Sequence, residues 1–281
     1  MYFTALSLML ASPATITDDR EPVVLDRVGK WAIHYDQDAC HLQAQFGTGD
    51  DQLLARFTRY AHVQGFDLLI TGKRVFTSTA QIDARLRFGA APRIELPGLS
   101  GRAAGQPVLI FNGLNLRQGP GPRNATREEE QAASSVTVDV GLKRPFQLVW
   151  GPLDKPMDAL RACTLDLIRS WGYDPEAWLH YSRHVVPIGS RNWILPKDFP
   201  GGAANRRYNG QVQYRLDIAP DGKPASCRVL FRTDPDKFAD ATCEALMRRA
   251  RFIPALDAKG TPVRSFYVSA VSWNFAPPVY E

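Results

Sequence analysis

The chain has 281 residues, which is room for two ordinary domains, and its 44% hydrophobic and 22% charged residues are typical of a globular protein. Its net charge of +5 lies mostly in residues 205–281, which hold 12 Lys and Arg against 8 Asp and Glu. Because no dense run of Lys and Arg with interleaved aromatic residues occurs, the composition argues against nucleic-acid binding. The mild basic bias instead favours attraction to an anionic surface or peptide.

Residues 1–14, MYFTALSLMLASPA, are mostly apolar and end in small residues. They resemble a short secretory signal peptide that is cleaved after Ala14, although no Lys or Arg precedes the apolar part. A disordered leader or a misassigned start is the alternative. The segment is shorter than the roughly 20 apolar residues that span a bilayer. We therefore expect an exported protein, either soluble or peripherally associated with the cell envelope.

The four cysteines, Cys40, Cys163, Cys227 and Cys243, are an even number without a C-x-x-C pair. Their number favours two disulfides in an oxidising compartment, and the missing pair argues against a zinc site. Four free buried thiols are the alternative.

Residues 20–174 are predicted to form a β-rich domain. Short segments alternate between apolar and polar residues and are separated by turn residues, a pattern typical of an antiparallel sandwich or barrel. Residues 118–135 are polar and rich in Gly and Pro, so we predict a long exposed loop there. The predicted strands lie at 30–36, 39–47, 51–60, 65–73, 81–89, 93–98, 107–117, 136–140 and 146–151.

One helix is predicted to end this domain, between Pro156 and Gly172, since Pro suits a first helical turn and Gly the position after the last. Leu160, Cys163 and Leu167 recur at helical spacing, so Cys163 is expected to face the sheet. It would there meet Cys40, the other cysteine of this half.

Residues 175–207 have no hydrophobic period and are rich in Pro and Gly. We predict a linker that docks on the rest of the protein through Trp193 and Phe199.

Residues 208–281 are predicted to fold as strand, strand, helix, strand. Asp221-Gly222 marks a hairpin turn, and Cys227 lies on one face of the second strand. The helix is expected to end at Pro254, with Cys243 on its apolar face, so that Cys227 and Cys243 are within reach of a disulfide. The whole chain is thus predicted to be α+β. The residues of the helical stripe are Ala239, Cys243, Leu246, Ala250 and Ile253.

Residues 193–277 resemble the C-terminal domain of TonB, the periplasmic energy transducer of outer-membrane transport. The resemblance rests on Phe199-Pro200, on NGQVQYRLDIAPDGKP with its Asp221-Gly222 turn, and on CEALMRRARFIPALDAKGTPV at 243–263. It implies a periplasmic, non-catalytic protein without cofactors. Its partners would be box peptides of outer-membrane TonB-dependent receptors or other envelope proteins.

The resemblance also implies how such a peptide binds, namely as an added strand at the sheet edge. The third strand of the module is the candidate edge, although its aromatic residues suit a core equally well. The candidate edge residues are Arg264, Phe266, Tyr267, Val268, Ser269, Val271 and Trp273.

Two other functions stay open. The family transducer has a membrane anchor and a Pro-rich spacer, whereas this chain shows a β-rich domain, so the module could serve only scaffolding, fold stability or a homodimer. An enzyme with its site in the β-rich domain is the less favoured alternative. The notable polar features are His180 and His184 at helical spacing, the adjacent Cys40 and His41, and the acidic stretch 47–51. None forms a recognisable catalytic or metal motif.

Overall fold

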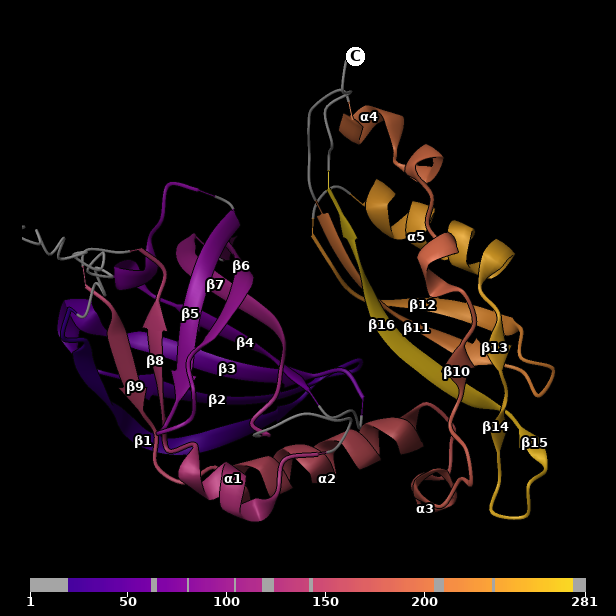
Figure 1. The fold of residues 1–281 in the computed structure, drawn as a ribbon, viewed down its shortest axis with the longest axis horizontal. Coiled ribbons are helices and arrows are strands. Elements are labelled where there is room, and N and C mark those ends of the chain that lie inside the picture. Colours follow the sequence, from indigo (N-terminus) through magenta and orange to yellow (C-terminus); the bar gives the residue numbers. More distant parts are fainter. Residues whose placement is uncertain are drawn as a thin grey trace, which may run out of the picture.

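The computed structural model describes residues 20–61, 65–79, 81–103, 105–117, 124–141, 144–204, 210–233 and 236–274. These residues form an α+β protein, as predicted, in which a closed β-barrel is followed by a smaller sheet with one helix (Figure 1). The signal peptide predicted at residues 1–14 lies outside the described residues. Among the described residues, every helix is too short or too polar to cross a membrane.

Nine strands close the barrel in the order β1-β2-β3-β4-β7-β6-β5-β8-β9. Neighbouring strands are antiparallel except β1 and β9, which pair in parallel where the barrel closes. Buried and less buried residues alternate along strands such as β2 and β5, which is the pattern the sequence shows. The strands are β1 (Val23–Tyr35), β2 (Cys40–Phe46), β3 (Leu53–Arg59), β4 (Phe66–Thr71), β5 (Gln81–Phe88), β6 (Ile94–Ala103), β7 (Gln106–Leu114), β8 (Ser135–Asp139) and β9 (Phe146–Val149).

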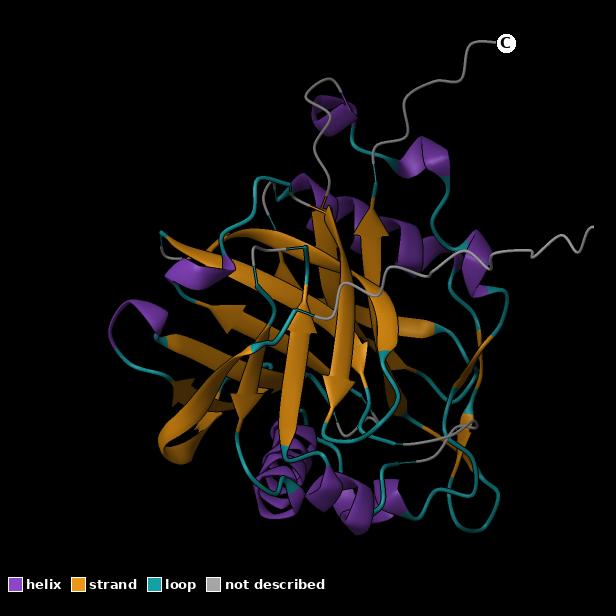
Figure 2. Cartoon of the chain, turned by 60° about the vertical axis from the view of Figure 1, so that its left-hand side comes forward, coloured by secondary structure: helices purple, strands orange, loops and turns teal. Residues whose placement is uncertain are grey.

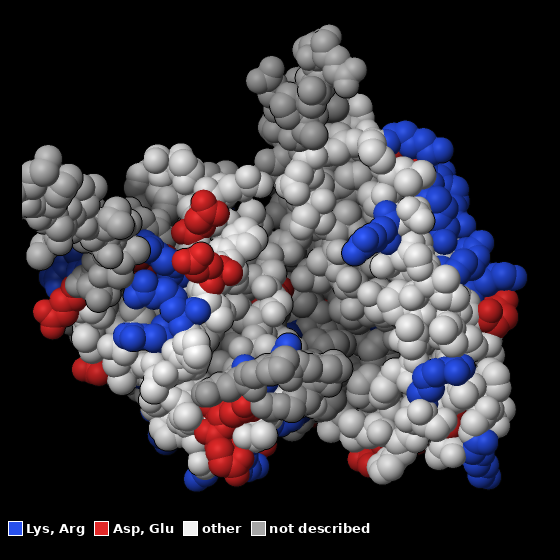
Figure 3. Space-filling model, viewed as in Figure 1, with Lys and Arg blue, Asp and Glu red and all other residues white. Residues whose placement is uncertain are grey.

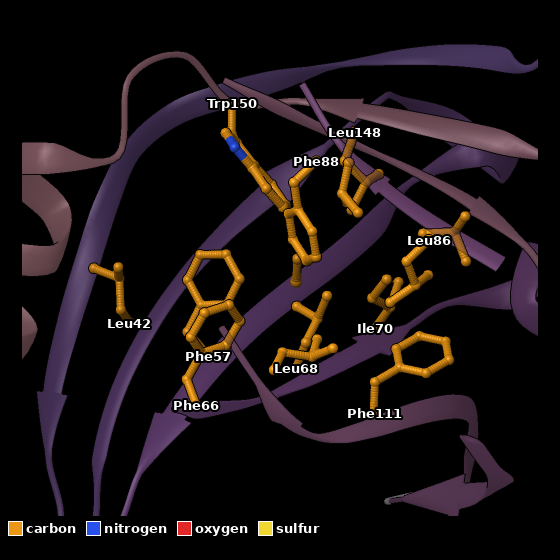
Figure 4. Packing of buried hydrophobic residues seen from close by; sticks show 14 of the residues in the cluster. Leu42, Phe57, Phe66, Leu68, Ile70, Leu86, Phe88, Phe111, Leu148 and Trp150 are labelled. Atoms are coloured by element: carbon orange, nitrogen blue, oxygen red, sulfur yellow. The ribbon is translucent and has the colours of Figure 1, made fainter. Parts of the chain in front are cut away.

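Aliphatic and aromatic side chains fill the barrel interior (Figure 4). The Phe57 ring centroid lies 4.8 Å from that of Phe66 and 5.3 Å from that of Trp150. The Trp150 indole donates a hydrogen bond to the carbonyl oxygen of Ala133 at 2.7 Å, so its polar atom is paired although it is buried. The barrel is therefore a packed core.

Two helices lie at the base of the barrel (Figure 1). Helix α1 (Arg127–Ala132) corrects the prediction of a continuous loop over 118–135, because Thr126 and Glu129 form a capping box that starts a short helix. Helix α2 (Asp154–Ser170) buries its apolar side on the barrel, and Cys163 forms a disulfide with Cys40 of β2.

The segment predicted as a linker contains short elements and packs on the C-terminal module. Trp193 is buried, with its ring 4.9 Å from Phe252, and Phe199 packs on Phe238 at 5.6 Å. Its elements are α3 (Pro175–Leu179), β10 (Val186–Pro187), the 3-10 turns at Ser190–Asn192 and Pro196–Asp198, and α4 (Gly201–Ala204).

The C-terminal module has a three-stranded antiparallel sheet in the order β12-β11-β16, with α5 across one face (Figure 1). Cys227 of β12 and Cys243 of α5 form the second disulfide. Three short strands connect α5 with β16. The elements are β11 (Gly210–Ile218), β12 (Pro224–Arg232), α5 (Lys237–Arg249), β13 (Phe252–Ile253), β14 (Ala255–Leu256), β15 (Pro262–Val263) and β16 (Ser265–Trp273).

Helix α5 ends at Arg249, which corrects the prediction that it continues to Pro254. Ala250 has an extended backbone, and Ile253 pairs with Val186 of the linker strand β10. The Phe252 N–H donates to the carbonyl oxygen of Gly222, so the β11–β12 turn holds this segment extended. Ile253 is 40% exposed, and its helical spacing in the sequence is therefore coincidental.

Candidate functional site

Strand β16 is an edge of the C-terminal sheet and pairs with β11 without interruption from Ser265↔Ile218 to Trp273↔Gly210. The opposite edge, β12, is less regular, because the β11–β12 register shifts twice and leaves Ala225 and Leu230 as bulged residues. Bulges and a proline blunt a sheet edge, and Pro224 begins β12. Of the two edges, β16 is thus the one whose backbone is geometrically suited to accept another strand.

The candidate edge residues divide between the two faces of β16. Phe266 is 5% exposed and packs toward α2 and the linker, and Trp273 is 3% exposed and stacks on Phe238 of α5. Tyr267 packs on Phe252. Phe266 and Trp273 are therefore core residues, whereas Tyr267, Val268, Ser269 and Val271 are half-buried.

Tyr173, just before the linker, and Tyr181 of the linker cover the beginning of β16. The Tyr173 hydroxyl lies within hydrogen-bond distance of both the Ser265 carbonyl oxygen, at 2.9 Å, and the Asp217 carboxylate, at 2.8 Å. The Tyr181 hydroxyl donates to the carbonyl oxygen of Arg264 at 3.2 Å. The exposed Arg264 places its guanidinium 4.6 Å from the centre of the Tyr173 ring. Within the described part of the chain, the backbone of residues 268–272 pairs with β11 alone, so these residues are the candidate open part of the edge.

The strands of the barrel and of the C-terminal module are seen together in Figure 2. The sheet of the module contacts the barrel through polar side chains. Gln211 accepts a hydrogen bond from Asn112 at 3.2 Å. Arg228 forms a bidentate ion pair with Asp38, with distances of 2.7 and 2.9 Å. Gln211, Gln213 and Arg215, which alternate with the apolar residues of β11, are buried at this interface.

Asp67 of β4 is a titratable group in this interface. Its carboxylate accepts hydrogen bonds from the Gly113 N–H at 2.9 Å and from the Gln213 amide at 3.2 Å. Burial is the largest influence and raises the pKa of the Asp67 carboxyl, while the two hydrogen bonds lower it. Because the folded-state pKa lies above the unfolded value, the contribution of Asp67 to stability is present at low pH and is lost as the pH rises through the folded-state pKa.

We therefore predict that Asp67→Asn unfolds at an equal or higher urea concentration than the wild type at about pH 7, with a smaller difference at about pH 4. The amide oxygen still accepts from Gly113, and no buried charge is lost or gained with pH. Asp67→Ala is the control, because it leaves both donors unpaired and is expected to cost about 1–3 kcal/mol. Urea unfolding at both pH values measures this, and a less stable Asp67→Asn variant at neutral pH would contradict it.

The other polar features of the sequence do not form a site. Cys40 is a disulfide partner, so the Cys40-His41 pair offers no thiol. His180 follows the last residue of α3, and His184 lies beyond the helix and packs on Trp178 at 4.5 Å. The carboxylates of Asp50 and Asp51 pair with Lys73 and Arg74. No group of three or more metal-ligating side chains occurs among the described residues.

Comparison with known families agrees with this geometry. Residues 196–277 match the family described as Gram-negative bacterial TonB protein C-terminal, which confirms the resemblance predicted for 193–277. These residues form a TonB-like protein-interaction module. The match covers less than a third of the chain and does not include the barrel. No curated protein matches the chain.

Proposed function

We propose that the chain is a periplasmic, non-catalytic protein that binds the N-terminal box peptides of outer-membrane receptors by strand addition to β16. The observation that carries this proposal is the regular edge of β16 in a module that matches the TonB C-terminal family. An extended peptide beside residues 268–272 would gain main-chain hydrogen bonds there. Its alternate side chains would lie over the two faces of the sheet and provide selectivity.

The charge of the module supports an anionic partner. Lys and Arg side chains gather along the outer side of the module, beside α5 (Figure 3). Lys237, Arg248 and Arg251 are exposed there. Such a field raises the local concentration of acidic segments and accelerates their association at low ionic strength.

The contacts of Tyr173 and Tyr181 with the beginning of β16 favour a second candidate function. The tyrosine hydroxyls that cap the beginning of β16 shorten the open edge, as expected if the module serves scaffolding or fold stability. In that case residues 268–272 would pair with a second copy of the chain or with nothing. Light scattering across a concentration series separates these cases, since a homodimer through β16 would compete with added peptide.

We predict that box peptides shift the NMR signals of β16 and that their N-methylation weakens binding with a period of two residues. Alternate N–H groups of an added strand point toward the sheet, so methylating one of them removes a ladder hydrogen bond. Methylation at these positions is expected to lower affinity about tenfold or more, and methylation at the intervening positions only slightly. The measurement is a titration of the isotope-labelled, oxidised chain.

The methyl groups of Val268 and Val271 report on the proposed edge, and that of Val229 on β12 is the matched control. Shifts confined to β16 support strand addition. Equal shifts on β12, or the same loss of affinity from methylation at neighbouring positions, would rule this binding mode out. If millimolar peptide causes no shift, peptide binding is ruled out and the scaffolding function is favoured.

A further inference from the structure

A pocket of about 610 Å³ lies where the barrel, α2 and the C-terminal sheet meet. Its walls include the β1–β2 turn at residues 36–38, the end of α2 from Asp166 to Trp171, and the side chains of Arg215 and Arg228. The Cys40–Cys163 disulfide also lines it. The volume is in the range of sites for small organic ligands. Since the barrel with α2 and the C-terminal sheet both contribute to the walls, the pocket exists only when the sheet is docked on the barrel.

Arg215 is the unusual group in this pocket. It lies on β11, is 8% exposed, and places its guanidinium 4.3 Å from the centre of the Trp171 ring. Its Nε lies 3.3 Å and its Nη2 3.5 Å from oxygens of Asp217, a carboxylate that also accepts a hydrogen bond from the Ser226 hydroxyl and lies 2.8 Å from the Tyr173 hydroxyl. The Arg215 Nη1 is buried without a hydrogen-bond partner in the described part of the protein.

Trp171 supplies a second donor of the same kind. Its indole Nε1 is also buried without a hydrogen-bond partner among the described residues. The ring is half-buried and belongs to the residue that follows the last turn of α2. The Arg215 Nη1 and the Trp171 indole N–H are thus two unsatisfied donors on groups that lie against each other, and a carboxylate offers two oxygens that can accept from such donors.

Most acidic groups in and beside the pocket have a basic partner of their own. Asp38 is paired with Arg228, Asp166 with Arg169, and Asp217 with the Nε and Nη2 of Arg215. Asp36 is exposed at the rim, with an oxygen 3.7 Å from the His41 ring nitrogen. The unsatisfied donors are therefore the Arg215 Nη1 and the Trp171 Nε1, and Leu167 is an apolar residue of the pocket wall.

We propose that this pocket binds a small ligand that carries a carboxylate next to a flat or apolar group. The carboxylate would accept hydrogen bonds from Arg215 and Trp171, and the apolar part would lie against Leu167. A free organic acid and the carboxyl terminus of a short peptide share this chemistry. The proposal does not rest on strand addition to β16, and it gives the ligand a role in holding the sheet against the barrel.

The test is an NMR titration of the indole N–H signals of the intact, oxidised chain, which has six Trp. Trp171→Phe assigns the signal of Trp171. Sodium benzoate is the free-acid probe, and benzamide and sodium chloride control for shape and ionic strength. Acetyl-Ala-Phe with a free carboxylate is the peptide probe, and its carboxamide is the matched control. Benzoate or the peptide acid is expected to shift the Trp171 signal saturably, with a Kd of roughly 1 mM.

Arg215→Gln is expected to weaken this binding about tenfold or more, because the side chain keeps donors but loses its charge. Arg191→Gln removes an exposed arginine outside the pocket and should leave the Kd unchanged. Ser170→Tyr fills the pocket with a ring and leaves the Arg215 side chain in place, and it should abolish binding. It is the second variant for the case that Arg215→Gln does not fold. The proposal is overturned if neither acid gives a saturable shift, if the neutral controls bind equally, or if Arg215→Gln and Ser170→Tyr bind like the wild type.

Discussion

Replacing Cys40 and Cys163 together by alanine is expected to lower the free energy of unfolding by about 4–5 kcal/mol. The two cysteines are 123 residues apart in sequence, and each is 1% exposed between α2 and the barrel. In the loop-entropy description, a disulfide stabilises the fold by restricting the unfolded chain, and the effect grows slowly with loop length. This bond also joins the end of the β-rich region to its beginning, so its loss would free α2 from the barrel.

The second disulfide is the matched control for this prediction. Cys227 and Cys243 are 16 residues apart, and their replacement by alanine should cost about 3 kcal/mol. Denaturant unfolding of the two double variants measures the difference, which we expect to be about 1.5–2 kcal/mol. Equal losses from both variants would show that loop length does not govern the stabilisation. A Cys40 and Cys163 variant as stable as the wild type would show that α2 is held by packing alone.

The largest single-residue effect is expected from Phe266→Ala, which should destabilise the protein by about 3–5 kcal/mol. The Phe266 ring stacks on Trp178 at 5.5 Å and meets Trp171 and Tyr173 edge to face at 5.2 and 5.1 Å. Phe266 thus joins β16 to the linker and to the end of α2. Truncating its side chain leaves a cavity at the point where the C-terminal sheet meets the rest of the protein.

Phe266→Ala also separates a structural role from a binding role in the candidate edge set. In the absence of denaturant, at a temperature where the variant and the wild type are both folded, we expect the affinity of Phe266→Ala for box peptides to stay within about threefold of the wild-type value. The reason is that strand addition uses the backbone of residues 268–272. Val268→Ala, on the same face and half-buried, should cost only about 1 kcal/mol. A large loss of affinity in folded Phe266→Ala would place Phe266 in the binding site.

The sequence by itself determined the α+β class, the strand-rich first part and the order of strands and helix in the C-terminal module. These features follow from local periodicity and turn residues, as in β2, whose buried residues alternate along the strand, and at Asp221-Gly222. The disulfide pairings were also predictable, because Cys163 and Cys243 each lie on the apolar face of a helix. The family match of residues 196–277 rests on the same local patterns.

Only the tertiary structure decided which of these residues meet between the barrel and the C-terminal module. The end of α5 at Arg249 depends on the pairing of Ile253 with Val186, which lies far away in the sequence. The unpaired donors of Arg215 and Trp171, and the ion pair between Arg228 and Asp38, arise where β11 and β12 dock against the barrel and α2. Periodicity tells which residues share a face of a strand, but not what covers that face, because the covering surface is built by residues distant in the chain.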